Sequence, residues 1–309
     1  MNICRSDDET KNVVAADFAQ WACRTTCDCR SLPLLSLQRL RQIFDDRIVP
    51  LYLGGTAVSQ ERPVALYIMG QPGAGKTTIT QRIVQAQEVN EAVRICADDL
   101  KQFHRFHEPL MWHNSRTAGF RLRKDLKVWM RQIMRFAVHH RAHVVIEISP
   151  DRPEEFLRSA GALSRQGYQI KLITLAVRAA DSFQSVAYRY ATTRTPDMPA
   201  RFTTRSGHHT CFRASEDTLR QAEDAESVDR IMLVDRQGKP LWSSRRPNGL
   251  SASQVLAEQR NRPYELEEAV CFMRTQEWLW DQLPAHRDEV EEIDRLAAPL
   301  LPQVMKPSI

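Results

Sequence analysis

Short apolar runs alternate with longer amphipathic stretches through most of this chain. The apolar runs are short enough to be buried strands, and they occupy residues 63–69, 93–96, 143–148, 168–177 and 229–234. The stretches between them show helical spacing, most clearly at residues 122–139, 153–166 and 179–190. Strands that alternate with helices predict an α/β fold, with a doubly wound parallel sheet of about five strands flanked by helices.

Two regions of different character flank this alternating pattern. Residues 1–33 are polar and irregular, and a helical pattern then begins, with apolar positions at Leu37, Leu40, Ile43 and Phe44. Beyond Pro247 the chain becomes helical again, with one expected apolar face formed by Leu266, Val270, Met273 and Trp280. We therefore expect an irregular N-terminal segment at residues 1–33, a catalytic domain at residues 34–246 and a C-terminal helical extension at residues 247–309.

The composition narrows the class of protein. With 309 residues, of which 42% are hydrophobic and 26% charged, the chain suits one α/β enzyme domain with helical appendages. It has no run approaching the roughly 18 apolar residues that cross a bilayer, and its first residues do not form a secretory signal. We expect a cytoplasmic protein with no membrane partner.

The net charge and the cysteine content say less about function. The net charge of +5 favours anionic ligands, but a nucleotide-binding enzyme needs such charge as much as a nucleic-acid binder does, and we expect no nucleic-acid partner. Four of the seven cysteines lie within residues 1–33, at Cys4, Cys23, Cys27 and Cys29. They lack the paired CxxC spacing of zinc sites, so we expect reduced thiols, with a metal-bound cluster as the alternative.

A complete phosphate-binding loop follows the first apolar run and opens a helix. It consists of Gly70, Gln71, Pro72, Gly73, Ala74, Gly75, Lys76 and Thr77, and Thr78 continues the helix. Its glycines allow backbone N–H groups to approach phosphates, and the helix N-terminus adds partial positive charge. Lys76 is expected to reach the β- and γ-phosphates, and the Thr77 hydroxyl to ligate Mg²⁺. The strand before this loop and the helix after it argue against a chance match.

Acidic residues end two other predicted strands. Phosphoryl transfer to a hydroxyl requires a carboxylate that orients the acceptor, and Asp98 follows the run at 93–96. Its neighbour Asp99 is either a helix cap or the base itself. Glu147 ends the run at 143–148, where Mg²⁺ or the acceptor would lie, unless it is only a salt-bridged edge residue.

Several arginines follow the fourth predicted strand. Arg189, Arg194, Arg201 and Arg205 lie in or next to a stretch with prolines at 196 and 199, which is typical of a lid loop. Arginines at such a position could stabilise the negative charge that develops on a transferred phosphoryl group.

Taken together, these motifs resemble the zeta-toxin family of P-loop kinases, the toxin halves of bacterial toxin–antitoxin pairs, over roughly residues 35–245. The Gln71-Pro72 pair fits the family's loop. Asp98 to His104 resembles the family's Asp-x-Phe-Arg-x-x-His segment, which makes Asp98 the implied general base and leaves Lys101 where arginine is usual. The segment at 146–149 resembles the family's Ile-Glu-Gly-Thr strand end.

The resemblance also implies roles for residues beyond the loop. Glu147 and Ser149 would serve metal and acceptor binding, and Arg189 and Arg201 would bind phosphates. An arginine commonly follows the family's Gly-Thr pair, and Arg152 is the substitute here, shifted by one residue.

The ligands implied by the family are ATP or GTP with Mg²⁺, together with a nucleotide-sugar acceptor. The acceptor would be UDP-N-acetylglucosamine, phosphorylated on its 3′-hydroxyl, and a small helical antitoxin would cover the nucleotide site. One alternative is a P-loop kinase for another small molecule, such as a dinucleotide like NAD, an antibiotic hydroxyl or a polynucleotide end. Another is a nucleotide-dependent switch that binds a protein partner, although a pure switch has no need of the acceptor-side carboxylate Asp98.

Overall fold

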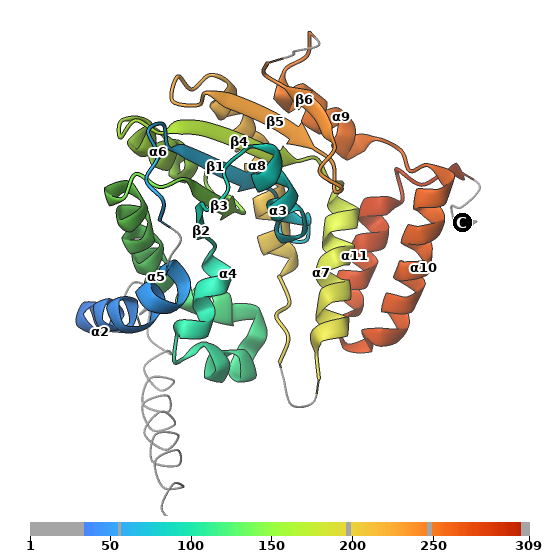
Figure 1. Cartoon of the computed structure of the whole chain (residues 1–309). Coiled ribbons are helices and arrows are strands. Elements are labelled where there is room, and N and C mark those ends of the chain that lie inside the picture. Colours follow the sequence, from blue (N-terminus) through green and yellow to red (C-terminus); the bar gives the residue numbers. More distant parts are fainter. Residues whose placement is uncertain (1–33, 55–56, 196–198, 246–248, 304–309) are drawn as a thin grey trace, which may run out of the picture.

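A sheet of six strands, in the order β2-β3-β1-β4-β5-β6, forms the centre of the part of the chain that the structure describes (Figure 1). This computed structural model describes residues 34–54, 57–195, 199–245 and 249–303. The strands are β1 (Val64–Met69), β2 (Val93–Ile95), β3 (Val144–Ile148), β4 (Gln169–Leu175), β5 (Arg230–Val234) and β6 (Pro240–Ser243).

The first five strands are parallel, which confirms the predicted fold class. The sixth strand was missed, because β6 is short, begins with a proline and pairs antiparallel at the edge of the sheet. A tight turn connects it to β5: the Asp235 carboxylate accepts hydrogen bonds from the backbone N–H groups of Gln237 and Lys239, and Gly238 has a φ of +83°.

Helices cover both faces of the sheet. They are α3 (Lys76–Ala86), α4 (Ala97–Leu100), α5 (His107–His139), α6 (Pro153–Ser164), α7 (Ala179–Thr193) and α8 (Arg205–Glu223), with a short 3₁₀ turn η2 (Lys101–Phe103) after α4. Alternate residues of β1 face opposite sides: Tyr67 and Met69 pack with α5 and α6, whereas Leu66 and Ile68 pack with α3. The helix α8, which the sequence did not predict, contributes to the same face as α5 and α6.

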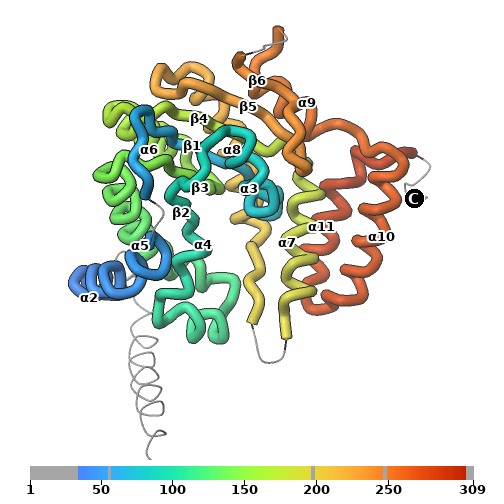
Figure 2. The backbone as a smooth tube through the Cα atoms, viewed as in Figure 1, coloured from blue at the N-terminus to red at the C-terminus, as the bar shows by residue number. Residues whose placement is uncertain are grey.

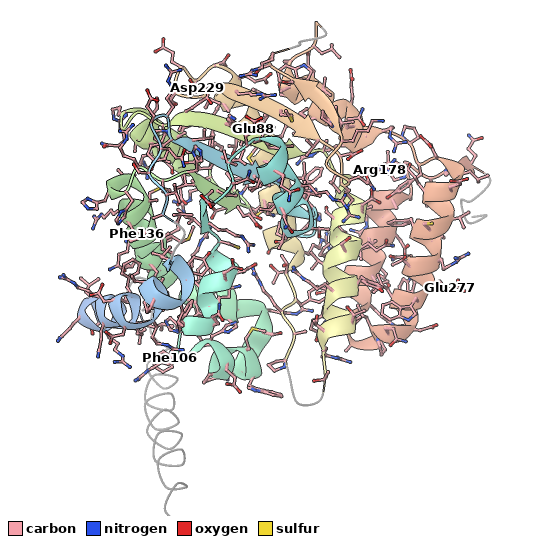
Figure 3. All side chains as sticks on the ribbon, in the orientation of Figure 1. Glu88, Phe106, Phe136, Arg178, Asp229 and Glu277 are labelled. Atoms are coloured by element: carbon pink, nitrogen blue, oxygen red, sulfur yellow. The ribbon has the colours of Figure 1, made fainter. Side chains whose placement is uncertain are left out.

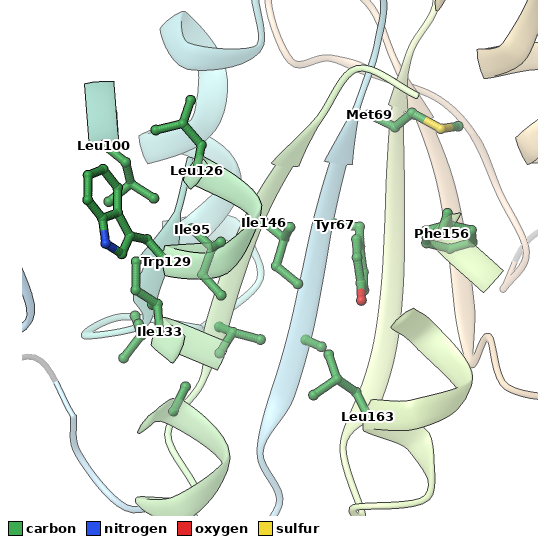
Figure 4. Packing of buried hydrophobic residues seen from close by; sticks show 14 of the residues in the cluster. Tyr67, Met69, Ile95, Leu100, Leu126, Trp129, Ile133, Ile146, Phe156 and Leu163 are labelled. Carbon is green, nitrogen blue, oxygen red and sulfur yellow. The ribbon is translucent and has the colours of Figure 1, made fainter. Parts of the chain in front are cut away.

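The packing of α5 shows how the amphipathic pattern produces the core. Leu126, Trp129 and Ile133 lie at three- and four-residue spacing and are buried against Ile95 of β2 and Ile146 of β3 (Figure 4). Trp129 is fully buried, and its indole N–H donates a hydrogen bond of 2.9 Å to the carbonyl oxygen of Leu40. This contact ties the helix α2 (Leu37–Ile43) to α5, which packs on the sheet.

The helix α5 begins earlier than the predicted residue 122. Its backbone is non-helical at Asn114, whose side-chain oxygen accepts hydrogen bonds from the N–H groups of Arg116 and Thr117. Asn114 therefore caps a second helical segment, and the first segment, from His107, lies beside the site described below.

The C-terminal extension comprises α9 (Ala252–Asn261), α10 (Leu266–Gln282), η3 (Pro284–His286) and α11 (Arg287–Ala297). The helices α10 and α11 lie beside α7 (Figures 1 and 2), and the three share a hydrophobic cluster. At the start of α7, Arg178 donates hydrogen bonds to Glu268 and to the carbonyl oxygen of Arg262 (Figure 3).

The expected apolar face of α10 was wrong. Its buried residues are Ala269, Phe272, Gln276 and Leu279. Leu266 is 60% exposed and Val270 is 39% exposed, while Met273 and Trp280 are only partly buried.

The N-terminal part of the described chain is helical, with α2 followed by η1 (Phe44–Leu53). The predicted irregular segment at residues 1–33, with its four cysteines, lies outside the described residues. Within the described residues, Cys96, Cys211 and Cys271 are free thiols, and no group of three or more histidine, cysteine and acidic residues is placed to hold a metal. No helix in that part of the chain is both long and apolar enough to span a membrane.

Candidate active site

The phosphate-binding loop connects β1 to α3, with Gly75 preceding the first helical residue. Gly73 has a φ of +78°, and a Cβ atom there would lie 2.0 Å from the carbonyl oxygen of Ser182, so only glycine allows the loop to pack against α7. Gly75 has a φ of +97°, but a Cβ there would meet no atom within 4 Å. Its conformation alone requires glycine.

Two side chains hold the loop from its inner side. Gln71 is fully buried, and its amide N–H₂ donates to the carbonyl oxygen of Val177 and to Ser182 Oγ, both at 3.0 Å. Arg236 donates to the carbonyl oxygen of Gly73 at 2.6 Å. The side chain of Gln71 thus faces the interior, which leaves its backbone as the part available to a phosphate.

Lys76 lies between the loop and the end of β3. Its Nζ donates to the carbonyl oxygens of Gly70 and Gln71 at 2.7 and 3.1 Å, and to Ser149 Oγ at 2.7 Å. Burial lowers the pKa of Lys76 to about 8, although the Glu147 carboxylate acts in the opposite direction. The structure therefore brings together Lys76 and Ser149, which the sequence had placed on separate motifs.

Glu147 is the most heavily bonded acid of the site. One carboxylate oxygen accepts from Thr77 Oγ1 at 2.9 Å, and the other accepts from Thr80 Oγ1 at 3.0 Å and from Arg94 Nη2 at 2.8 Å. Only 4% of the Glu147 side chain is exposed. The register of the sheet explains this convergence, because Glu147 pairs with Ile68 of β1, two residues before the loop.

The two neighbouring acids after β2 have different surroundings. Asp98 pairs with Lys101, and Arg201 Nη1 lies 2.9 Å from the same carboxylate oxygen. Burial opposes the charge on Asp98, but Lys101 and Arg201 outweigh it and hold the pKa of Asp98 well below its usual range.

Asp99 faces away from these cations. It pairs with Arg94 at 3.0 Å and accepts a long hydrogen bond of 3.4 Å from Tyr52. Burial raises the pKa of Asp99. The two acids, which the sequence pattern alone could not separate, are thus distinguished: Asp98 faces the basic residues of the site, and Asp99 faces the strand arginine.

The arginines after β4 do not act as one group. Arg201 lies beside Gly119 of α5, where an added Cβ would be 3.6 Å from its guanidinium. Arg189, on α7, has an exposed side chain and interacts electrostatically with Arg201 and Asp98. Arg205 instead pairs with Glu292 at 3.4 Å, and Arg194 lies over the ring of Tyr190.

The residue next to Arg201 fixes its position. The Phe202 ring stacks on His286 of η3 at 5.0 Å with an interplanar angle of 9° and meets Tyr190 edge-on at 4.9 Å. The Arg116 guanidinium, from α5, lies 5.3 Å from the centre of the Phe202 ring and hydrogen-bonds His286 Nδ1 at 2.7 Å. The C-terminal extension therefore supports the segment that carries Arg201.

Arg152 is not brought to the site by any contact that the structure describes. It precedes α6 with an exposed side chain and forms no ion pair with a described residue. Its neighbour Asp151 instead pairs with Arg123 of α5 at 2.7 Å.

His104, at the end of the segment that begins with Asp98, lies in the protein core. It is buried and shares a hydrogen bond of 3.0 Å with Asp125. Asp125 also accepts from the backbone N–H groups of Leu34 and Leu35, both at 3.0 Å. This pair joins the segment after β2 to α5 and to the start of the described chain.

The oxygen atoms around the loop fit a magnesium ion bound together with phosphates. Thr77 and Glu147 supply a hydroxyl and a carboxylate in direct contact, and both are hard oxygen donors. Magnesium in such sites uses one or two protein oxygens, with phosphate oxygens and water completing the shell. Such a site needs no cluster of three acidic or histidine ligands.

Sequence reasoning missed Arg94, Thr80 and Arg236. Arg94 carried a usable signal, since a charged residue between Val93 and Ile95 in a buried strand needs an acidic partner. Arg236 had no such signal, because it reaches the loop across 163 residues of sequence.

Comparison with known proteins identifies the family of this chain. The family model for zeta toxin matches residues 51–246. Toxin zeta of Streptococcus pyogenes is 26% identical over 219 residues, covering 71% of this chain and 75% of that protein. Toxin PezT of Streptococcus pneumoniae is 25% identical over 202 residues, covering 65% of this chain and 79% of that protein.

Solved structures share the fold. One from the PezAT chromosomal toxin–antitoxin system of Streptococcus pneumoniae has a TM-score of 0.64 at 19% identity, covering 85% of this chain and 99% of that one. One of AvrRxo1-ORF1:-ORF2 with ATP has a TM-score of 0.52 at 11% identity, covering 86% of this chain and 96% of that one. The structures support the fold, and the family match extends over more than half of the sequence. The chain belongs to the zeta toxin family.

Proposed function

We propose that this protein is an ATP-dependent kinase that transfers the γ-phosphoryl group to a hydroxyl of a nucleotide-activated sugar, and that it acts as a zeta-type toxin. The observation that carries the proposal is the contact between the phosphate-binding loop and the residues that follow β3. Lys76 of the phosphate-binding loop meets Ser149 at 2.7 Å, and Asp98 lies with Lys101 and Arg201 at the same edge of the sheet.

The donor side would be formed by the loop and α3. Backbone N–H groups of residues 70–78 and the α3 N-terminus would bind the phosphates, and Lys76 would exchange its present carbonyl partners for phosphate oxygens. Thr77 and Glu147 would hold Mg²⁺, which neutralises charge on the β- and γ-phosphates when it is bound. Arg94 and Thr80 would keep the Glu147 carboxylate in place.

On the acceptor side, Asp98 would orient the attacking hydroxyl and accept its proton. Its low pKa keeps it ionised at neutral pH, so it can accept a hydrogen bond from the hydroxyl until the proton is transferred. A strong base is not needed, because phosphoryl transfer passes through a loose transition state in which the nucleophile carries little charge.

Arg201 and Arg189 would act on the transferred group. Arg201 contacts Asp98 directly, and Arg189 lies within electrostatic range of both. A phosphoryl group between Lys76 and Asp98 would offer Arg201 a second anionic partner. Arg201 would thereby stabilise the charge that develops in the transition state.

For the acceptor we propose UDP-N-acetylglucosamine, phosphorylated on the 3′-hydroxyl. Support comes from family membership and from the acceptor-side set of Asp98, Lys101, Glu147 and Ser149, in which Lys101 offers positive charge for a diphosphate. The contribution proposed for Arg152 would require its exposed side chain to turn toward the site. Arg123 is an alternative to Arg152 for this contribution, because its ion pair with Asp151 holds it beside the segment between β3 and α6.

We further propose a small helical antitoxin as the partner and the cytoplasm as the place of action. The titles of two solved structures support the partner: one concerns the PezAT toxin–antitoxin system, and the other a complex of AvrRxo1-ORF1 with AvrRxo1-ORF2. Both substrates of the proposed reaction are nucleotides, which suits a cytoplasmic kinase.

The test is to incubate the purified protein with Mg²⁺ and ATP and a panel containing UDP-N-acetylglucosamine, UDP, NAD and a 5′-hydroxyl oligonucleotide. The products and the position of the new phosphate are then identified by mass spectrometry. We expect a monophosphorylated UDP-N-acetylglucosamine. Phosphorylated NAD with no phosphorylated sugar would overturn the proposed acceptor while leaving the kinase chemistry intact.

A further inference from the structure

The side chain of Gln71 connects the phosphate-binding loop to three other parts of the fold. Its amide N–H₂ group donates to the carbonyl oxygen of Val177, two residues after β4, and to Ser182 Oγ on α7. Its amide oxygen accepts a hydrogen bond of 3.1 Å from Arg260 Nη2 on α9. These partners fix the amide orientation, since a carbonyl oxygen can only accept and a guanidinium can only donate.

Arg260 is the most deeply buried arginine among those that the structure describes. It is 3% exposed, and its closest carboxylate oxygen, on Glu216, is 4.0 Å away. Its other contacts are the carbonyl oxygen of Phe212 at 3.0 Å and the Phe212 ring, which lies 4.0 Å from the guanidinium carbon. A buried charge whose nearest carboxylate oxygen is 4.0 Å away is costly to the fold, so Arg260 depends on its hydrogen bonds to Gln71 and Phe212 for compensation.

The same hydrogen-bonded group extends to α8. Ser182 Oγ shares a hydrogen bond of 2.9 Å with His208 Nε2 on α8. Both side chains are fully buried, and the His208 ring stacks on Phe183 at 4.8 Å. The helix α7 also carries Arg189, and α8 begins shortly after Arg201. Gln71 is therefore the point at which the loop, α7 and α9 meet.

We propose that Arg260 is a positioning residue for the phosphate-binding loop, and that it acts by holding the Gln71 amide. The C-terminal extension, which lies beyond the 51–246 match to the family model, would then be a working part of the nucleotide site. The inference rests on the proposed function in one respect, namely that the loop binds ATP.

The geometry explains why arginine is needed at this position. Two nitrogens of one planar group reach Gln71 Oε1 and the Phe212 carbonyl oxygen while the plane lies against the Phe212 ring. A lysine could make only one of these hydrogen bonds well and would lose the stacking. Loss of the anchor would free the loop to shift, and its N–H groups must match the phosphates closely to bind them.

The experiment compares Arg260→Lys and Arg260→Met with Arg262→Lys, which makes the same chemical change two residues away. Arg262 contacts Glu265 and Glu268 on the surface of the extension and makes no contact with the loop. The dissociation constant for a non-hydrolysable ATP analogue with Mg²⁺ is measured by calorimetry on the full chain. We expect it to rise about tenfold for Arg260→Lys, more for Arg260→Met, and to stay unchanged for Arg262→Lys.

A double-mutant cycle with Gln71→Met separates positioning from general stability. If Arg260 acts through Gln71, Arg260→Lys should add little further loss of affinity in the Gln71→Met background. The proposal is overturned if the Arg260 variants melt at a lower temperature but bind the analogue as wild type does, or if the two effects simply add. Wild-type protein that binds no nucleotide would instead contradict the proposed function itself.

Discussion

Arg94 offers a sharp test of how the proposed magnesium site is held together. The perturbation is Arg94→Met, which keeps an aliphatic chain of similar length and removes the guanidinium. Two ion pairs are lost, one of 2.8 Å to Glu147 and one of 3.0 Å to Asp99. The Glu147 side chain is only 4% exposed, so its carboxylate would keep the two threonine hydroxyls as partners but lose its cation.

The expected loss of unfolding free energy follows from the exposed fractions of the two side chains. Breaking a fully buried ion pair costs about 3–5 kcal/mol, but 38% of the Arg94 side chain is exposed, which reduces the expected loss of unfolding free energy to about 2 kcal/mol. The carboxylate of Glu147 should also become easier to protonate and less well oriented, so the Mg²⁺ concentration for half-maximal activity should rise several-fold.

The assays are urea unfolding and a Mg²⁺ titration of kinase activity at saturating ATP. Arg230→Met is the matched control, because Arg230 is also a strand arginine but contacts Gln87 at 3.3 Å and forms no ion pair within the described part of the chain. We expect the control to change stability by less than about 1 kcal/mol and to leave the Mg²⁺ dependence unaltered. The reasoning is refuted if Arg94→Met and Arg230→Met behave alike in both assays.

Three further predictions concern the loop and the acceptor side. Lys76→Ala should weaken ATP binding in calorimetry, whereas Asp98→Ala should bind ATP nearly as wild type does and lose turnover; full turnover in either variant would refute its assigned role. Arg201→Ala should lower kcat by at least about a hundredfold and change KM less, and loss of kcat on Arg205→Ala but not on Arg201→Ala would contradict the contact with Asp98. The pKa of Lys76 without nucleotide is about 8, and only its charged form is expected to bind phosphate. ATP affinity should therefore fall as the pH rises above about 8, by up to roughly tenfold per pH unit. An ATP affinity that is constant from pH 7 to 9.5 would contradict this.

The sequence predicted the elements whose signal is local. Five parallel strands were predicted as buried apolar runs, and the phosphate-binding loop by its glycines. The local sequence pattern gave a wrong prediction where contacts with other helices determine which face of a helix is buried. Leu266 and Val270 have the right spacing for a buried face of α10, yet α7 and α11 cover the face that contains Phe272 and Leu279 instead.

In the candidate site too, contacts between distant parts of the chain could not be predicted from the local sequence. Asp98 and Asp99 are adjacent in a short helix, and only the positions of Lys101, Arg201 and Arg94 distinguish them. Contacts across long sequence separation had no readable signal: Arg260 and Gln71 are 189 residues apart. The predicted roles of the site residues, and the division of the chain at residues 34 and 247, stay predictions.

The central claim is that Asp98 and the loop direct a phosphoryl group onto an acceptor hydroxyl rather than onto water. The most direct measurement uses ATP labelled in the γ-phosphate with UDP-N-acetylglucosamine present, and it compares the label on the sugar nucleotide with the label released as inorganic phosphate. Wild type should place most of the transferred label on the sugar, and Asp98→Ala should place almost none there. Label that appears only as inorganic phosphate from wild type, with every acceptor of the panel, would contradict a kinase and indicate a nucleotide-hydrolysing switch.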